Sequence, residues 1–116
     1  MLPAAARLRR REDFTTVFRS GRKIARGPLV LHVTRSPFAD DLSTMPRIGF
    51  VIPAKVGNAV ARNRLRRRLR HLLRDRLDRL PANGGLVVRA LPGAAELRSP
   101  ELAALLDAAL PAGGGR

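Results

Sequence analysis

One stretch of the sequence, KVGNAVARNRLRRRLRHLLR over residues 55–74, concentrates side chains that can bind a polyanion. After Asn58 it carries seven arginines and one histidine, and it contains no acidic residue. A guanidinium group is planar and permanently charged, and its fixed donors match the two oxygens of a phosphate group. The chemistry that this stretch predicts is therefore recognition of phosphates, and not a reaction carried out by its own side chains.

The like charges in this stretch have an energetic cost. Four arginine pairs are spaced i, i+4: Arg62–Arg66, Arg64–Arg68, Arg66–Arg70 and Arg70–Arg74. In an isolated helix each costs about 0.2–0.5 kcal/mol, so the set costs roughly 1–2 kcal/mol. A phosphate backbone reverses the penalty, because each neutralised phosphate also releases counterions. The alternative is a solvated basic face with no ligand, although only Asp75 and Asp78 relieve the charge between Lys55 and Leu80.

The element that must position these arginines is a long helix. Asn58, after Gly57, is a typical N-cap, and Pro81 with the glycines beyond it is expected to end the helix. The expected apolar stripe consists of Leu65, Leu69, Leu72 and Leu73, extended by Leu77 and Leu80. On a helical wheel, the edge away from these leucines holds Asn63, Arg67, Arg70 and Arg74. Two borders flank the leucines. Arg62 and Arg66 lie at the border beside the sheet, and Arg64 and Arg68 lie at the other border. Gly57 and Asn58 can also admit a phosphate to the helix N-terminus.

Further elements are expected on both sides of this helix. Residues 7–19 read as a helix with Leu8, Phe14, Val17 and Phe18 on one side, closed by Gly21 in a left-handed cap conformation. Residues 29–35 and 47–53 alternate like strands, and the turn-rich segment 36–46 predicts that they form an antiparallel hairpin. Another strand is expected over 86–91, followed by a helix with Ser99 as N-cap and Pro100 at its first position.

This pattern predicts an α+β fold. We expect a small, mostly antiparallel sheet of about four strands packed with three helices, in the order α-β-β-β-α-β-α, with one layer of helices over the sheet. Residues 1–116 are expected to form a single RNA-binding domain, with a loose N-terminal arm over 1–6 and a disordered tail over 112–116.

Composition narrows the class of partner. The chain has 116 residues, a net charge of +14 and no cysteine, which excludes disulfides and thiolate metal sites. No stretch resembles a signal peptide or reaches the length of a membrane span. A charge of this size predicts a polyanionic partner, with nucleic acid favoured over an anionic membrane surface or an acidic protein.

The arginine-rich stretch resembles the signature region of the bacterial ribonuclease P protein subunit. Arg62-Asn63-Arg64 matches the Arg-Asn-Arg core of that family, and Lys55-Val56-Gly57-Asn58 matches the Lys-hydrophobic-Gly-Asn that precedes it. Arg66, Arg67 and Arg70 match the basic positions that follow. A second match upstream comprises Asp13, Phe14, Val17, Phe18 and Gly21, and the order of elements agrees across roughly residues 7–110.

The resemblance implies a subunit that does not cleave RNA itself. It joins a catalytic RNA and helps it to remove the 5′ leader from precursor tRNA. The resemblance also implies a left-handed βαβ crossover around the arginine helix. The residues that it implies for RNA binding are Lys55, Asn58, Arg62, Asn63, Arg64, Arg66, Arg67, Arg70 and Arg74. Those that it implies for a leader cleft are Phe14, Phe18, Val30 and His32. Mg²⁺ is expected to act through the RNA and the RNA–protein interface, with no protein-only site. The protein is expected in the cytoplasm, with no membrane or protein partner.

Three of these residues allow more than one interpretation. Phe14 and Phe18, one helical turn apart, can serve as stacking platforms for bases, as plain core, or as both. His32 departs from the Tyr that the family often has at this strand position. It can stack, donate a hydrogen bond and titrate near neutral pH, or it can be a partly exposed strand residue without a role.

Two other functions remain as alternatives. A ribosomal or other structural RNA-binding protein without a processing role shares the size and charge of this chain. A metal-dependent nuclease is disfavoured, because it needs converging carboxylates, whereas Glu12-Asp13 and Asp40-Asp41 lie at a predicted helix start and in a predicted loop. We therefore assign no catalytic residue and no metal ligand.

Overall fold

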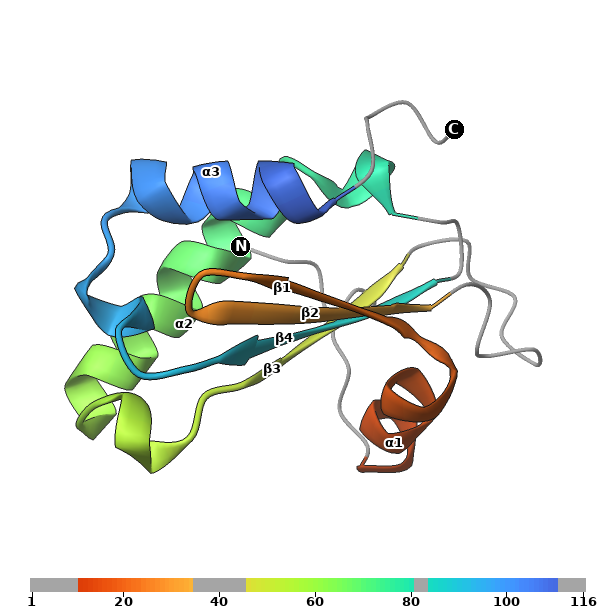
Figure 1. Cartoon of the computed structure of the whole chain (residues 1–116), viewed down its shortest axis with the longest axis horizontal. Helices are drawn as coiled ribbons and strands as arrows, with labels where there is room; N and C mark the ends of the chain where they lie inside the picture. The colour runs from red at the N-terminus through yellow and green to blue at the C-terminus, as the bar shows by residue number, and fades with distance from the viewer. Residues whose placement is uncertain (1–10, 35–45, 81–83, 111–116) are drawn as a thin grey trace.

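The computed structural model describes residues 11–34, 46–80 and 84–110. Its helices and strands are α1 (Arg11–Ser20), β1 (Arg22–Arg26), β2 (Leu29–Thr34), β3 (Arg47–Val51), α2 (Ala59–Arg74), β4 (Gly85–Ala90) and α3 (Ser99–Ala109), with short 3-10 turns η2 (Ala54–Val56), η3 (Leu77–Arg79) and η4 (Ala94–Glu96). The predicted order α-β-β-β-α-β-α is confirmed (Figure 1). The expected arm over 1–6, the expected tail over 112–116 and most of the expected loop over 36–46 lie outside the described residues.

The four strands form one mixed sheet in the order β1-β2-β4-β3. β1 pairs with β2 and β2 with β4 in antiparallel fashion, whereas β3 and β4 are parallel. The predicted hairpin between residues 29–35 and 47–53 is therefore wrong, because β4 lies between the two strands. Two strands joined by a short connection need not pair with each other, because a later strand can insert between them and form hydrogen bonds with both. The left-handedness of the β3-α2-β4 crossover stays a prediction.

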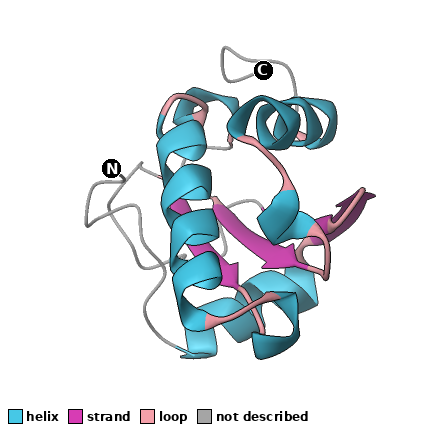
Figure 2. Cartoon of the chain, turned by 90° about the vertical axis from the view of Figure 1, so that its left-hand side faces the viewer, coloured by secondary structure: helices cyan, strands magenta, loops and turns pink. Residues whose placement is uncertain are grey.

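Helices cover both faces of this sheet (Figure 1). On one face, Leu29 and Leu31 of β2 share a core with α2 and α3. On the opposite face, Val17 of α1 packs against Val87 of β4, with Phe14 beside them. The expected single layer of helices is therefore wrong, because the central strands are apolar on both faces and each face needs a cover. In Figure 2 the long helix α2 lies in front of the strands.

The junction between α1 and β1 depends on a close approach of backbones. The amide of Gly21 donates to the carbonyl of Val17 at 2.9 Å. A Cβ atom on Gly21 would lie 2.5 Å from the Val17 oxygen and 3.0 Å from the Val33 oxygen. Gly21 does not have the positive φ of Gly27 and Gly93, so the predicted left-handed cap is wrong. Glycine is needed here for space, since it has no Cβ.

Helix α2 begins as predicted and ends earlier than predicted. The Asn58 side chain accepts a hydrogen bond from the Ala61 amide at 2.8 Å, which confirms the N-cap. The helix stops at Arg74, and η3 follows in place of the expected continuation to Leu80. The predicted stripe faces the core, with Leu65, Leu69, Leu72 and Leu73 buried or half-buried.

Ion pairs connect the segment after α2 to helix α3. Arg76 reaches both carboxylate oxygens of Asp107, at 2.7 and 3.2 Å, and Arg79 also donates to that carboxylate. These hydrogen bonds, Arg76 foremost, lower the pKa of the Asp107 carboxyl to about 2. The carboxyl is therefore ionised at neutral pH, and the two arginines after α2 serve the fold.

Helix α3 starts one residue earlier than its predicted N-cap implies. Ser99 is already its first residue, and the amide of Arg98 donates to the Glu101 carboxylate at 2.9 Å. Pro100 lies in the first turn, where its missing N–H removes no helical hydrogen bond. In the part of the chain that the structure describes, no helix is long and apolar enough to cross a lipid bilayer.

Candidate RNA-binding surfaces

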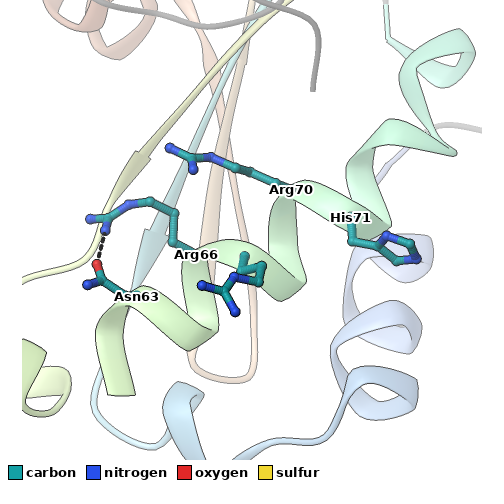
Figure 3. A pocket seen from close by; sticks show the side chains of 5 residues that line it. Asn63, Arg66, Arg70 and His71 are labelled. Carbon is teal, nitrogen blue, oxygen red and sulfur yellow. Dashed lines mark hydrogen bonds between the residues drawn. The ribbon is translucent and has the colours of Figure 1, made fainter. Parts of the chain in front are cut away.

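The outer side of α2 forms an open depression of about 380 Å³ that is almost entirely basic. Its lining consists of Asn63, Arg66, Arg67, Arg70 and His71 (Figure 3). Four of these five are predicted RNA-binding residues, and His71, which the sequence places on the helix away from the leucines in a solvated or phosphate-facing position, completes the lining. The helical period brings the five residues together, because positions three and four apart lie on one side of a helix.

The arginines of α2 differ in how far the protein already engages them. Arg62 donates from Nε to the Gly57 carbonyl at 3.1 Å, and Arg68 donates to the Leu97 carbonyl at 2.9 Å. Arg64 and Arg67 are exposed and form no hydrogen bond or ion pair with the described residues. A phosphate can therefore bind Arg64 and Arg67 without breaking a protein contact, whereas Arg62 and Arg68 also stabilise the fold.

Two members of the depression are held in place by neighbours. Arg66 donates to the Asn63 side-chain oxygen at 3.0 Å (Figure 3). The guanidinium carbon of Arg70 lies 5.9 Å from the centre of the Phe50 ring, within cation–π range. Arg70 is thus half-buried toward β3. The helical wheel predicts a position on the edge away from the leucines, and that prediction is wrong for Arg70. Both contacts restrict rotamers, which lowers the entropy lost when a phosphate binds.

The remaining predicted RNA-binding residues lie at the two ends of α2. Lys55 in η2 and the cap residue Asn58 are both exposed at the N-terminal end. The side-chain oxygen of Asn58 already accepts from the helix backbone. Arg74 lies at the other end, 3.6 Å from Asp75, and is exposed. The structure therefore spreads the predicted set along the whole length of the helix.

The predicted leader residues lie on the face of the sheet that α1 covers. Phe18 is 38% exposed, whereas Val30 and His32 of β2 are 5% and 6% exposed. Phe14 is half-buried beside Val17 and Val87. Phe18 is thus the one of these four whose ring a base can reach directly, and Phe14 takes part in the core. The expectation that His32 could be a partly exposed strand residue is wrong, because α1 packs over β2.

His32 is held neutral by its surroundings. Burial, followed by the charges of Arg89 and Lys23, lowers the pKa of His32 from its ordinary value of 6.5. Its Nε2 atom is buried and has no hydrogen-bond partner within the described residues. An uncharged imidazole with an unsatisfied nitrogen can accept or donate one hydrogen bond if Phe18 moves aside.

Sequence reasoning missed the two cations beside His32. Lys23 lies opposite His32 in the β1–β2 pair, and Arg89 lies opposite Val30 in the β2–β4 pair, so both belong to the α1 face. Arg89 is half-buried on a central strand and forms no hydrogen bond with the described residues. An arginine within an apolar strand pattern, as in LVVRA, was the available signal for a site.

The chain offers no evident metal centre in the part that the structure describes. Nowhere in residues 11–34, 46–80 and 84–110 do three His, Asp or Glu side chains come together. What the two surfaces offer chemically is cations for phosphates and, at Phe18, an exposed ring for base stacking.

Comparison with known proteins shows which family the chain resembles along nearly its whole length. The family model described as Ribonuclease P matches residues 2–112. A Streptomyces avermitilis protein named "Ribonuclease P protein component" is 52% identical over 114 residues, which cover 95% of this chain and 93% of that protein. A Salinispora tropica protein of the same name is 48% identical over 126 residues, covering 97% and 93%.

Solved structures of RNase P proteins share the fold. A mutant Staphylococcus aureus RNase P protein with defective mRNA degradation activity superposes with a TM-score of 0.78 at 22% identity, over 90% of this chain and 85% of that one. The RNase P protein from Thermotoga maritima gives 0.72 at 24% identity, over 88% and 92%. From the match along nearly its whole length and from its identity to these relatives, the chain belongs to the ribonuclease P protein family.

Proposed function

We propose that this chain is the protein subunit of a ribonuclease P ribonucleoprotein that removes the 5′ leader from precursor tRNA. The observation that carries the proposal is the division of predicted RNA-binding residues between two surfaces. The outer side of α2 presents the basic depression, and the α1 face presents Phe18 with Lys23 and Arg89 nearby. Two surfaces of different chemistry suit two different RNA partners.

The α2 side suits a folded catalytic RNA. Its charges lie on a rigid helix, which fixes their spacing as recognition of a structured phosphate backbone requires. Arg64 and Arg67 have no competing protein contact in the described residues, and Arg66 and Arg70 are already oriented. Each phosphate that they neutralise contributes to affinity through release of counterions.

The α1 side suits the single-stranded leader. Single strands are bound by aromatic side chains on which bases stack and by cations that follow the backbone. Phe18 supplies the exposed ring, and Lys23 and Arg89 supply the cations. Val30 and His32 lie beneath as a largely apolar floor. Because α2 and α1 lie on opposite faces of a thin sheet, one protein can bind both RNAs at once.

The chemical step belongs to the RNA subunit in this proposal. The described residues offer no paired carboxylates, and His32 is buried and neutral, so we assign no general base or metal ligand to the chain. Mg²⁺ would be held by RNA phosphates and at the RNA–protein interface, where it would neutralise charge and activate the attacking water. The complex would act in the cytoplasm, where tRNA precursors are made.

Reconstitution tests the proposal. The purified chain is mixed with the catalytic RNA of the same organism and a precursor tRNA with a labelled 5′ leader, at a Mg²⁺ concentration at which the RNA alone is slow. We expect faster release of the intact leader than with RNA alone, and no cleavage by the protein alone. Equal rates with and without protein would contradict the proposal. In that case a purely structural RNA-binding role would be favoured by equal affinities for precursor and mature tRNA.

A further inference from the structure

A second group of cations lies at the opposite edge of the sheet from β3. We call it the β1 edge; it consists of Arg19 at the end of α1 and Arg22, Lys23 and Arg26 in β1, and all four side chains are exposed. Arg19, Arg22 and Lys23 form no hydrogen bond or ion pair with the described residues. Arg26 donates only to the carbonyl of its neighbour Ala25, at 2.7 Å. These cations therefore have no role in holding the described fold together.

Acidic side chains that the structure describes do not neutralise this edge. Between Phe14 and Thr34 the sequence contains no Asp or Glu. The acids with described side chains all lie between the end of α2 and α3: Asp75, Asp78, Glu96, Glu101 and Asp107. Asp107 is engaged by Arg76 and Arg79, and Glu101 accepts from the Arg98 amide. Among the described side chains, the β1 edge is thus a region of positive charge without an acidic partner.

The cations of β1 project to both sides of the strand. Ile24 packs against the core under α3, so Arg22 and Arg26, two residues away on either side, lie on that same face. Lys23 lies on the other face, opposite His32. Within residues 11–34, 46–80 and 84–110, β1 pairs with β2 alone, so its outward backbone forms the edge of the described sheet. A strand edge with cations on both flanks fits a groove bordered by two rows of phosphates.

Protection against edge-to-edge pairing is the simpler explanation for charge on an edge strand, and a lysine or two suffices for it. Here three of the five residues of β1 are cationic, and Arg19 adds a fourth charge beside them. Three strand spacings separate β1 from β3, or about 14 Å. The cations of α2, next to β3, and those of the β1 edge therefore lie toward opposite edges of the sheet.

We infer that the β1 edge binds the phosphate backbone of a double-helical segment of the catalytic RNA, separate from the segment at α2. This inference rests on the proposed function. The leader is not the occupant, because Arg22 and Arg26 lie on the face opposite to Phe18 and His32. With contacts at both edges of the sheet, the RNA fixes the orientation of the whole protein and not only the position of α2.

Salt dependence of binding is the first test. Arg22→Gln and Arg26→Gln are each compared with Arg98→Gln, which removes the same charge from an exposed arginine before α3. Affinity for the catalytic RNA, without precursor tRNA, is measured over a range of salt concentrations. We expect Arg22→Gln and Arg26→Gln to bind about four- to eightfold more weakly near 0.1–0.15 M salt and to lower the salt slope by about 0.7–0.9, with Arg98→Gln close to wild type.

Directed RNA cleavage is the second test. The chain has no cysteine, so a single introduced cysteine can carry an iron–EDTA group at one defined place. Ala25→Cys on β1, Val60→Cys on α2 and Ala104→Cys on α3 all use exposed positions. We expect Ala25→Cys to cut one helical segment of the catalytic RNA, Val60→Cys to cut a different one, and Ala104→Cys to cut neither.

The outcomes separate this inference from the proposed function. If wild-type protein does not bind the catalytic RNA, the proposed function fails first. If wild type binds but Arg22→Gln and Arg26→Gln behave like Arg98→Gln, the β1 edge is only a protected edge strand. Cuts from Ala25→Cys confined to precursor tRNA, or identical to those from Val60→Cys, would also overturn the inference.

Discussion

The rings of Phe18 and His32 form a T-shaped pair, with centroids 4.6 Å apart and planes inclined by 84°. Phe18 is 38% exposed, whereas the imidazole beneath it is 6% exposed. An edge-to-face pair directs the positive rim of one ring toward the negative face of the other. Phe18 therefore covers His32 and at the same time offers part of its own surface to a ligand.

Replacing Phe18 separates its two roles. Phe18→Leu keeps apolar cover over His32, so we expect a loss of stability below about 1.5 kcal/mol. It removes the stacking surface, so leader binding is expected to weaken by about 1–3 kcal/mol. Affinity for precursor and for mature tRNA, each with the catalytic RNA present, is the measurement. A matching loss for mature tRNA would place Phe18 away from the leader.

The buried imidazole predicts a pH dependence of stability. Because the folded pKa of His32 lies below the unfolded value of 6.5, the unfolded chain binds more protons just below that pH. Stability should therefore fall as pH drops below about 6.5. His32→Phe should flatten the difference in unfolding free energy between pH 7.5 and pH 5.5, as measured by urea unfolding. Asp107 does not interfere, since its stabilisation is lost only as the pH falls from its ordinary pKa of 3.8 through its folded pKa of about 2, below this range. An unchanged pH profile in His32→Phe would contradict this assignment.

Substitution of Gly21 by a residue with a Cβ atom is predicted to destabilise the fold, because the site has no space for that atom. A Cβ there would press on two backbone oxygens, at 2.5 and 3.0 Å, so Gly21→Ala should cost about 1–3 kcal/mol by separating α1 from β2. Gly27→Asn is the control, because its φ of 52° is tolerated by Asn and its nearest neighbours are side-chain methyl groups. Thermal unfolding of both variants decides the matter; equal stability of Gly21→Ala and wild type would show that the backbones separate without cost.

Neighbouring arginines of α2 should respond differently to substitution. Arg67 has no partner in the described residues, so Arg67→Gln should leave stability unchanged and lower the salt slope of RNA binding by about 0.7–0.9. Arg68 donates to the Leu97 carbonyl, so Arg68→Gln should lose about 1–2 kcal/mol of stability. Unfolding without RNA and salt titrations with RNA measure the two effects. Identical behaviour of the two variants would contradict the distinction between them.

Local features of the molecule could be predicted well. The Asn58 cap and the leucine stripe of α2 depend on residues within a few positions of each other, and both are confirmed. The arginine set could also be located, because helical spacing places Asn63, Arg66, Arg67 and Arg70 together without any tertiary contact. The family resemblance rests on the same contiguous motif.

Features that depend on distant residues could not be predicted. The predicted order includes a strand at this place, but its residues could not be assigned, because RKIAR has one large apolar residue and takes its strand form from pairing with β2. The hairpin was wrong because β4, fifty residues after β2, inserts between β2 and β3. The burial of His32 and the presence of Lys23 and Arg89 beside it follow from that insertion and from the packing of α1.

The local sequence thus predicts that this protein binds phosphates, because a capped helix carries its cations at a spacing that backbone hydrogen bonds impose. Tertiary packing decided which of those cations are available, since Arg68 is held by Leu97 and Arg70 by Phe50, whereas Arg67 is not. It also decided that Phe18 is reachable and His32 is not. The physical reason is that strand pairing and burial join segments far apart in the chain, and no local pattern of side chains specifies those partners.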